Sequence, residues 1–171
     1  MVFTALFAAV LCAVAPFSIK IGPIPLSFAT LVIYLAAGTL SWKYGVVSVV
    51  LYVMLGAIGL PVFSGFEGGF HKIAGVSGGF IIGYIPLALV TGLSVEYFRK
   101  KRLAFVLGMV FGTALLYTCG VAWFMFQMRF SLAAALMACV TPFLIGDSIK
   151  IIIAAIVAPQ LRLAIPLLNN K

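Results

Sequence analysis

The sequence predicts an all-α membrane protein: one domain, residues 1–171, folded as a compact bundle of six transmembrane helices. Three observations predict this class. Hydrophobic residues make up 65% of the 171 residues and charged residues only 8%, and the mean hydropathy is +1.29. A soluble core of this size could not bury so much apolar surface. Apolar stretches also recur at lengths close to the roughly 17 to 25 residues that cross a bilayer.

Five breaks in the apolar pattern separate the predicted helices. The breaks are residues 18–25, 41–44, 61–77, 97–102 and 125–131. The six apolar stretches are residues 2–17, 26–40, 45–60, 78–96, 103–124 and 141–161. The first stretch has no basic residues before it, and Pro16 would follow a cut after Ala15, so we expect a retained helix rather than a signal peptide. An even number of crossings places both termini on one side.

Basic residues predict the orientation, because loops rich in lysine and arginine stay in the cytoplasm. One side carries seven of them: Lys43, Arg99, Lys100, Lys101, Arg102, Arg162 and Lys171. The other side carries three: Lys20, Lys72 and Arg129. We therefore expect both termini in the cytoplasm and the long break 61–77 outside. The basic residues form no stripe on a helix face, which argues against nucleic-acid binding.

An aspartate and a lysine, Asp147 and Lys150, interrupt the last apolar stretch. Asp147 lies six residues past Thr141, about 9 Å below the outer surface at about 1.5 Å per residue. The two side chains share one helix face and can partly neutralise each other. They either pin helix packing or form a ligand site, and intramembrane ionisable groups favour the second. The pair alone leaves hydrogen-bonding capacity spare for a neutral ligand with N–H donors beside a carbonyl.

Residues 59–84 are unusually rich in glycine, with eight in this segment. Glycine permits a positive φ and a close approach of the main chain. Phe63, Phe66, Phe70 and Ile73 argue that the segment folds onto something apolar rather than staying a disordered loop. Irregular backbone at membrane depth is tolerated where it is buried or lines a cavity. We predict a structured outer lid loop between the third and fourth helices.

Four motifs resemble those of the BioY family, the biotin-binding S components of energy-coupling factor transporters. They are GPIPLSFATLVIYLAAG from Gly22, GAIGLPVFSGFEGGF from Gly56, GVSGGFIIGY from Gly75 and PFLIGDSIK from Pro142. The motifs are spread from Gly22 to Lys150, and the resemblance covers nearly the whole chain. Two positions depart from the family pattern: Val76 and Ser77 replace proline and threonine in G-P-T-G-G, and Ala29 stands near a frequent glutamine.

The resemblance implies high-affinity biotin binding and uptake in the plasma membrane of a prokaryote, with biotin as transported ligand, no catalytic cofactor and no enzyme activity. Asp147 would accept a ureido N–H of biotin, and Lys150 would donate to the ureido oxygen or a nearby acceptor. Lys72 is the nearest outer cation for the ligand carboxylate. The other expected binding residues are Phe63, Ser64, Gly65, Gly68, Gly69, Gly78, Gly79, Phe80 and Tyr84.

The chain has no G-x-x-x-x-G-K-[ST] motif for binding ATP phosphates. By resemblance, its partners are membrane lipid, a transmembrane coupling subunit and two cytoplasmic ATPase subunits. Ala5, Ala9 and Ala13 recur every fourth residue, and small residues in this register let another helix approach closely. The resemblance implies that this alanine face docks the coupling subunit, and packing within the bundle is the alternative.

Other functions would use some of the same residues. Binding of another vitamin, or ion-coupled transport through Asp147, would use the same features. A serine protease of the intramembrane type would use Ser77 in the sequence GVSG, but the only histidine, His71, lies in the same loop rather than on a later helix. The three cysteines lie in apolar stretches at no metal-like spacing, so no metal site is expected.

Overall fold

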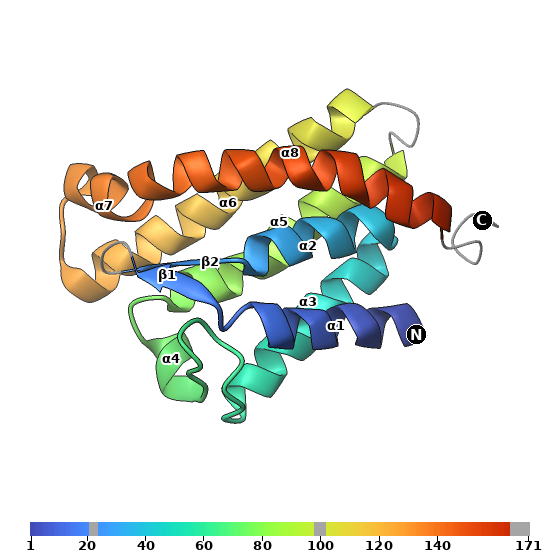
Figure 1. Cartoon of the computed structure of the whole chain (residues 1–171). Coiled ribbons are helices and arrows are strands. Elements are labelled where there is room, and N and C mark those ends of the chain that lie inside the picture. The colour runs from blue at the N-terminus through green and yellow to red at the C-terminus, as the bar shows by residue number, and fades with distance from the viewer. Residues whose placement is uncertain (21–23, 98–101, 165–171) are drawn as a thin grey trace.

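The computed structural model of the chain describes residues 1–20, 24–97 and 102–164 as an all-helical bundle with one short β-hairpin (Figure 1). The helices are α1 (Val2–Val14), α2 (Ala29–Thr39), α3 (Trp42–Ala57), α4 (Phe70–Ala74), α5 (Gly78–Tyr97), α6 (Arg102–Met128), α7 (Leu132–Cys139) and α8 (Thr141–Ala164). The strands are β1 (Ser18–Lys20) and β2 (Pro25–Ser27). The predicted all-α class is confirmed.

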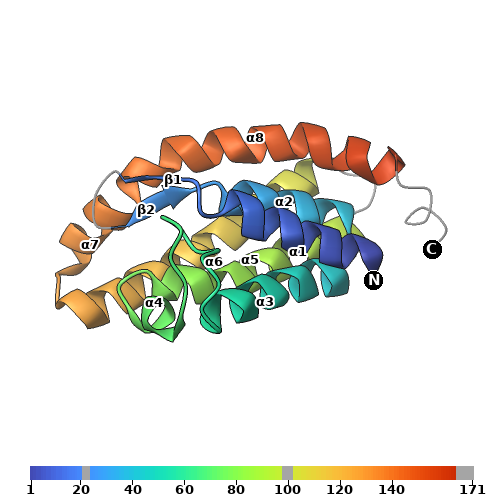
Figure 2. The same cartoon turned by 60° about the horizontal axis from the view of Figure 1, so that its bottom comes forward.

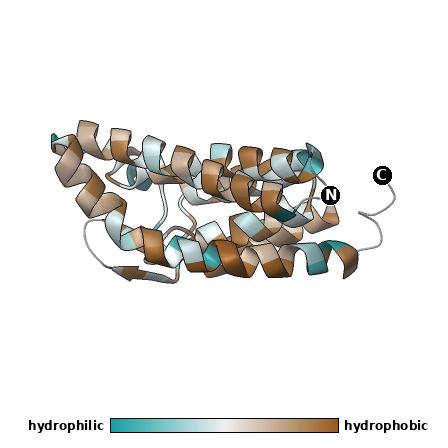
Figure 3. Ribbon diagram, turned by 90° about the horizontal axis from the view of Figure 1, so that it is seen from above, coloured by the Kyte–Doolittle hydropathy of each residue, from teal (hydrophilic) through white to brown (hydrophobic). Residues whose placement is uncertain are grey.

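Three helices, α5, α6 and α8, are long and apolar enough to cross a membrane. The apolar helices α1, α2 and α3 are shorter, with 13, 11 and 16 residues. Figure 3 shows hydrophobic residues along the helices, with many of the most hydrophilic ones near the ends of the bundle. This distribution suits a protein surrounded by hydrocarbon along its middle and by water at its ends.

The predicted helix boundaries needed several corrections. The first helix ends at Val14 rather than at residue 17, because Pro16 has no N–H with which to continue the helical hydrogen bonds. The second starts at Ala29 rather than at residue 26, because Pro25–Ser27 pairs as strand β2. The fifth continues past residue 124 to Met128 and ends where Arg129 adopts a positive φ of 54°. The unassigned residues before Thr141 form α7.

The β-hairpin was not predicted. Its strands pair antiparallel, with Ser18 opposite Ser27 and Ile19 opposite Leu26. The Ser27 hydroxyl donates to the Ala15 carbonyl at 2.9 Å and accepts from the Ala29 N–H at 3.0 Å. One buried serine therefore joins the end of α1 to the start of α2 and fixes where α2 begins.

Helix α2 is the centre of the bundle. Nine of its 11 residues are buried, and it packs against α1, α3, α5 and α8. Figure 2 shows it between α8 on one side and α3 and α5 on the other. Helices α5 and α6 form the most extensive helix pair. A Cβ on Gly79 would lie 2.3 Å from the Cβ of Trp123, so glycine allows these two helices to approach closely.

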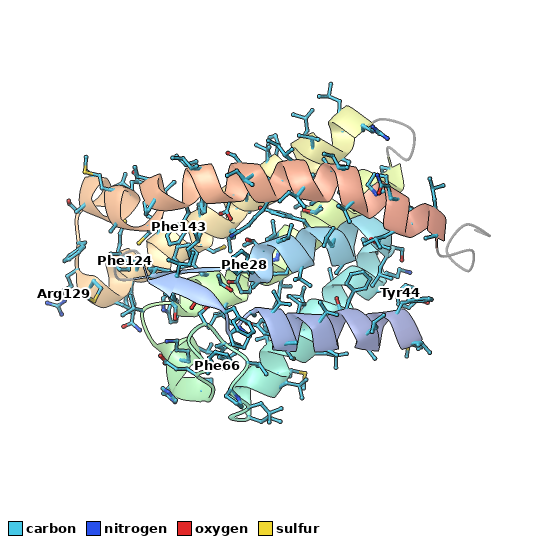
Figure 4. The ribbon with its side chains drawn as sticks, in the orientation of Figure 1. Phe28, Tyr44, Phe66, Phe124, Arg129 and Phe143 are labelled. Atoms are coloured by element: carbon cyan, nitrogen blue, oxygen red, sulfur yellow. The ribbon has the colours of Figure 1, made fainter. Side chains whose placement is uncertain are left out.

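The two ends of the bundle differ. The hairpin, α4 and α7 gather at one end, where Figure 4 places Arg129. The start of α1, the end of α8 and the turn from α2 to α3 lie at the other end, toward which Tyr44 lies (Figures 1 and 4). The basic run 99–102 was predicted to lie at this second end, but residues 99–101 lie outside the described residues.

The segment between α3 and α5 is folded onto the first end. Phe63 forms an isolated β-bridge with Glu67, and its side chain is only 1% exposed. The Gly65 N–H donates to the Pro16 carbonyl at 2.9 Å, and the φ of Gly65 is +83°, a conformation that favours glycine. At the other end of the segment, the Trp123 indole N–H donates to the Gly75 carbonyl at 2.9 Å. Hydrogen bonds from both sides therefore hold the segment in place.

Candidate functional site

Helix α8 has one face toward the bundle and one away from it. The inward face carries Asp147 and Lys150, which are 4% and 6% exposed. Phe143, Ala154 and Ala158 continue this buried face along the helix. The outward face carries exposed Ile145, Ile149, Ile152 and Ile156. The charged pair therefore points into the protein rather than toward lipid.

The charged pair is part of a polar cluster built by three other elements. The Lys150 ammonium donates to Asp147 Oδ1 at 2.9 Å, Thr30 Oγ1 at 3.0 Å and the Ser27 carbonyl at 2.7 Å. The Thr30 hydroxyl donates to Asp147 Oδ1 at 3.2 Å, and the Tyr117 hydroxyl donates to Oδ2 at 2.7 Å. An ammonium has three N–H donors, so Lys150 uses all of them here. Asp147 keeps acceptor capacity on Oδ2.

Local structure explains why these partners meet. The hairpin ends at Ser27, one residue before the cap of α2, so its carbonyl is available to Lys150. Thr30 lies in the first turn of α2, and Tyr117 lies on α6. Three elements that are distant from α8 in sequence thus meet one of its turns, which sequence spacing alone could not indicate.

The cluster lines a cavity between the hairpin, the α3–α5 segment and helices α2, α3, α5, α6 and α8. Its empty volume is about 570 Å³, including the part that opens outward. The main lining residues are Ser27, Thr30, Tyr52, Phe63, Ser64, Lys72, Ser77, Phe80, Ile81, Tyr84, Leu116, Tyr117, Phe143, Asp147 and Lys150.

Aromatic side chains form the walls of the cavity. Tyr52 packs edge-on against Phe63, with ring centroids 5.6 Å apart and planes at 86°. Tyr84 lies beside Tyr52 at 6.4 Å. On another wall, Phe80 and Phe143 are 6.4 Å apart. The site is therefore a mostly apolar slot with one strongly polar end, which suits a flat ring that carries polar edge groups.

The α3–α5 segment contributes a second charged group to the cavity. Lys72, on α4, lines it together with Ser64. Its ammonium pairs with Glu67 Oε2 at 2.6 Å. The cavity thus has a basic group on two elements, Lys150 on α8 and Lys72 on α4.

The cavity brings together seven of the residues that the sequence singled out: Phe63, Ser64, Lys72, Phe80, Tyr84, Asp147 and Lys150. The five predicted glycines do not line it: Gly65, Gly68, Gly69, Gly78 and Gly79. They shape the surrounding backbone instead. Gly68, for example, packs so tightly that a Cβ would meet the Leu60 carbonyl.

Sequence reasoning missed Ser27, Thr30, Tyr52, Tyr117 and Phe143. The hydroxyl groups of Thr30, Tyr52 and Tyr117 on apolar helices were a usable signal, because buried hydroxyls need partners. Ser27 acts through its carbonyl and carried no side-chain signal. Within the described ranges, no group of three His, Cys, Asp or Glu residues could hold a metal ion.

A bundle of apolar helices around a cavity with a buried charged end defines a membrane-embedded binding protein for a small ligand. The chain belongs to the BioY family, whose family profile matches residues 1–167. It is 36% identical over 158 residues to the biotin transporter BioY of Thermotoga maritima, covering 92% of each chain. It is 35% identical to the probable biotin transporter BioY of Pyrococcus horikoshii, covering 92% of this chain and 93% of the relative.

The fold also matches a solved structure, the S-component for biotin from an ECF-type ABC transporter. The TM-score is 0.88 at 28% identity, over 94% of this chain and 89% of the other. These relatives are transporters, so the chain is grouped with transporters rather than with enzymes. The intramembrane protease alternative gains no support from them.

Proposed function

We propose that this chain binds biotin with high affinity and acts in its uptake as the S component of an energy-coupling factor transporter. The names of the relatives and of the solved structure support this assignment. The observation that carries it is the buried Asp147–Lys150 pair, 2.9 Å apart, at the polar end of an aromatic cavity. Biotin has a complementary shape: a polar ureido ring fused to an apolar thiophane ring, with a carboxylate chain.

The ureido group would bind at the polar end. Asp147 would accept a ureido N–H, using the remaining capacity of Oδ2 beside the Tyr117 hydroxyl. Lys150 would donate to the ureido oxygen by exchanging one of its present contacts, of which that to Thr30 at 3.0 Å is the longest. The ureido group is neutral and so leaves the charge balance of the pair unchanged, which matters because an unpaired charge is costly in a membrane interior.

The rest of the ligand would lie along the apolar walls. Phe63, Phe80 and Tyr84 would pack against the rings and the aliphatic chain. Lys72 would meet the carboxylate, with Ser64 beside it. The α3–α5 segment, shaped by Gly65, Gly68, Gly69, Gly78 and Gly79, would act as a lid over the bound ligand.

We further propose six membrane crossings with both termini in the cytoplasm of a prokaryote. The common location of the start of α1 and the end of α8 supports an even number of crossings (Figure 1). The short helix α2 would complete its crossing together with strand β2, in which Pro25 and Leu26 are half-buried and Ser27 is buried. Extended backbone at membrane depth is tolerated in such surroundings.

Uptake would depend on a transmembrane coupling subunit and two cytoplasmic ATPase subunits. Ala5, Ala9 and Ala13 are exposed on α1, whereas Thr4, Ala8 and Leu11 are buried. The exposed alanines form a smooth face that a helix of the coupling subunit could approach closely. This exposure supports docking over packing within the bundle.

The direct test is to purify the chain from cells grown with a mixture of vitamins and to identify the copurified small molecule by mass spectrometry. Biotin in near-stoichiometric amount is the expected result. Another vitamin would redirect the assignment to a different S component. Recovery of no small molecule, together with no binding of added biotin, would contradict the proposal.

A further inference from the structure

Two lysines line the cavity, and their ammonium groups have different hydrogen-bond partners. All three N–H donors of Lys150 go to Ser27, Thr30 and Asp147. Lys72 has Glu67 as its carboxylate partner at 2.6 Å. The Lys72 side chain is 19% exposed and the Glu67 side chain 45% exposed. Lys72 is therefore the basic group that an acidic ligand can reach, and a carboxylate of the protein already sits on it.

Two carboxylates do not share one ammonium favourably. If the ligand carboxylate approached Lys72 while Glu67 stayed in place, two negative charges would face one positive charge across a few ångströms. Glu67 is the more exposed partner, with 45% of its side chain exposed, so it is the group that yields Lys72 to an arriving ligand carboxylate. Lys72 is more enclosed and keeps its need for an anionic partner.

We propose that Glu67 is a specificity-determining residue that competes with the ligand carboxylate for Lys72. This inference rests on the proposed binding of biotin. Binding of the acid exchanges one carboxylate for another on Lys72, and Glu67 turns to water. Simple anions make no contact with the aromatic walls or the polar end, so they do not displace Glu67. The site therefore selects acids whose ring fits the aromatic walls and the Asp147–Lys150 end.

Glu67 competes for Lys72 from within the same α3–α5 segment that carries Phe63 and Lys72. Its carbonyl accepts the Phe63 N–H at 2.9 Å, which holds the backbone of residues 63–67 in a tight turn. Phe63 lines the cavity, so the competing carboxylate is attached to the same turn that forms the aromatic wall. Its side chain can move without rebuilding that wall.

The experiment compares biotin with biotinamide, its neutral amide, for binding to the purified full chain. The variants are Glu67→Gln, Lys72→Gln and the double variant, and Glu96→Gln is the matched control. Glu96 is an exposed glutamate near the end of α5, so its replacement changes the net charge equally, away from the cavity. The ratio of the two affinities is the readout.

Glu67→Gln is expected to strengthen biotin binding by about two- to fivefold, the range that partly exposed ion pairs provide, and to change biotinamide binding by less than about twofold. Lys72→Gln weakens biotin binding selectively, and adding Glu67→Gln to it has no further effect. Glu96→Gln changes neither ligand. Unchanged biotinamide binding shows that the variants keep the fold of the cavity.

Weaker or unchanged biotin binding by Glu67→Gln overturns the inference, as does an equal change for acid and amide. In these outcomes the wild-type chain still binds biotin, and the proposed function stands. Failure of the wild-type chain to bind either form overturns the proposed function and this inference together.

Discussion

The chain contains two lysine–carboxylate pairs that share one cavity but differ in their surroundings. The Asp147–Lys150 pair lies on the long helix α8, and its side chains are 6% and 7% exposed. The Glu67–Lys72 pair lies on the α3–α5 segment, with 45% and 19% exposed. The first pair has further partners on a strand and two helices. Burial makes the first pair part of the protein framework, whereas water reaches the second pair, in which we propose that a ligand carboxylate replaces Glu67 on Lys72.

The largest effect should come from breaking the buried pair. Asp147→Asn leaves the Lys150 ammonium enclosed without a counter-charge, and loss of one partner of a buried pair typically costs about 3 to 5 kcal/mol. We expect a large drop in the thermal unfolding temperature in detergent. Biotin binding should weaken by about 10- to 150-fold, since hydrogen bonds to charged groups contribute about 1.5 to 3 kcal/mol.

Two further variants separate stability from binding in this experiment. Asp147→Asn combined with Lys150→Met removes both charges, and should recover much of the stability but not the affinity. Ser148→Ala is the matched control, because Ser148 is exposed on the same helix and its hydroxyl donates to the Leu144 carbonyl of that helix. Affinity within about twofold of wild type for Asp147→Asn would contradict the assignment of Asp147.

A smaller effect is expected from Tyr117→Phe, which removes a single donor to the buried carboxylate. The Tyr117 hydroxyl lies 2.7 Å from Asp147 Oδ2, the oxygen with acceptor capacity for the ligand. Its loss lets the carboxylate rotate, so biotin binding should weaken by about tenfold. Isothermal titration would measure this change. Tyr44→Phe, toward the opposite end of the bundle, is the control and should bind like wild type (Figure 4).

A smaller effect is expected from added salt, which should change biotin affinity differently in the wild-type chain and in Glu67→Gln. Ions screen exposed charges over about 10 Å at 0.1 M but reach buried pairs much less. In the wild-type chain, biotin exchanges one carboxylate for another on Lys72, so added salt should change its affinity by less than about twofold. In Glu67→Gln the contact with the ligand carboxylate is newly formed, so salt should weaken it by about threefold. Equal salt dependence in both proteins would argue against the exchange.

Much of the fold followed from apolar length and breaks alone, because a membrane chain must satisfy its backbone within helices. Helices α5 and α8 begin where the sequence predicted. The hairpin escaped prediction because its strands have three residues each, too short for a periodic pattern. Helix α7 escaped because its apolar residues merge with those of the last stretch.

The site was predictable only in part, because the sequence shows unusual residues but not which helices bring them together. Asp147 and Lys150 stand out because charges are rare in apolar segments, and aromatic residues near glycines pointed to the walls. Thr30 and Tyr117 matter because of neighbours that are 117 and 30 residues away. Such contacts depend on how the helices pack, and no local pattern records them. Ser27 uses a main-chain carbonyl, which every residue possesses.

The smallest effect on ligand binding should come from substitutions on the outer face of α1, because this face is proposed to dock a partner and not to bind the ligand. Ala9→Trp places a large ring on the exposed alanine face that we propose as the docking site. We expect biotin binding within about twofold of wild type but loss of biotin uptake in cells, because a bulky side chain prevents close helix approach. Val10→Trp is the control, since Val10 is also exposed, at 37%, but lies off the alanine stripe. Normal uptake by Ala9→Trp, or equal loss in both variants, would contradict docking through this face, because only a contact specific to the stripe separates the two positions.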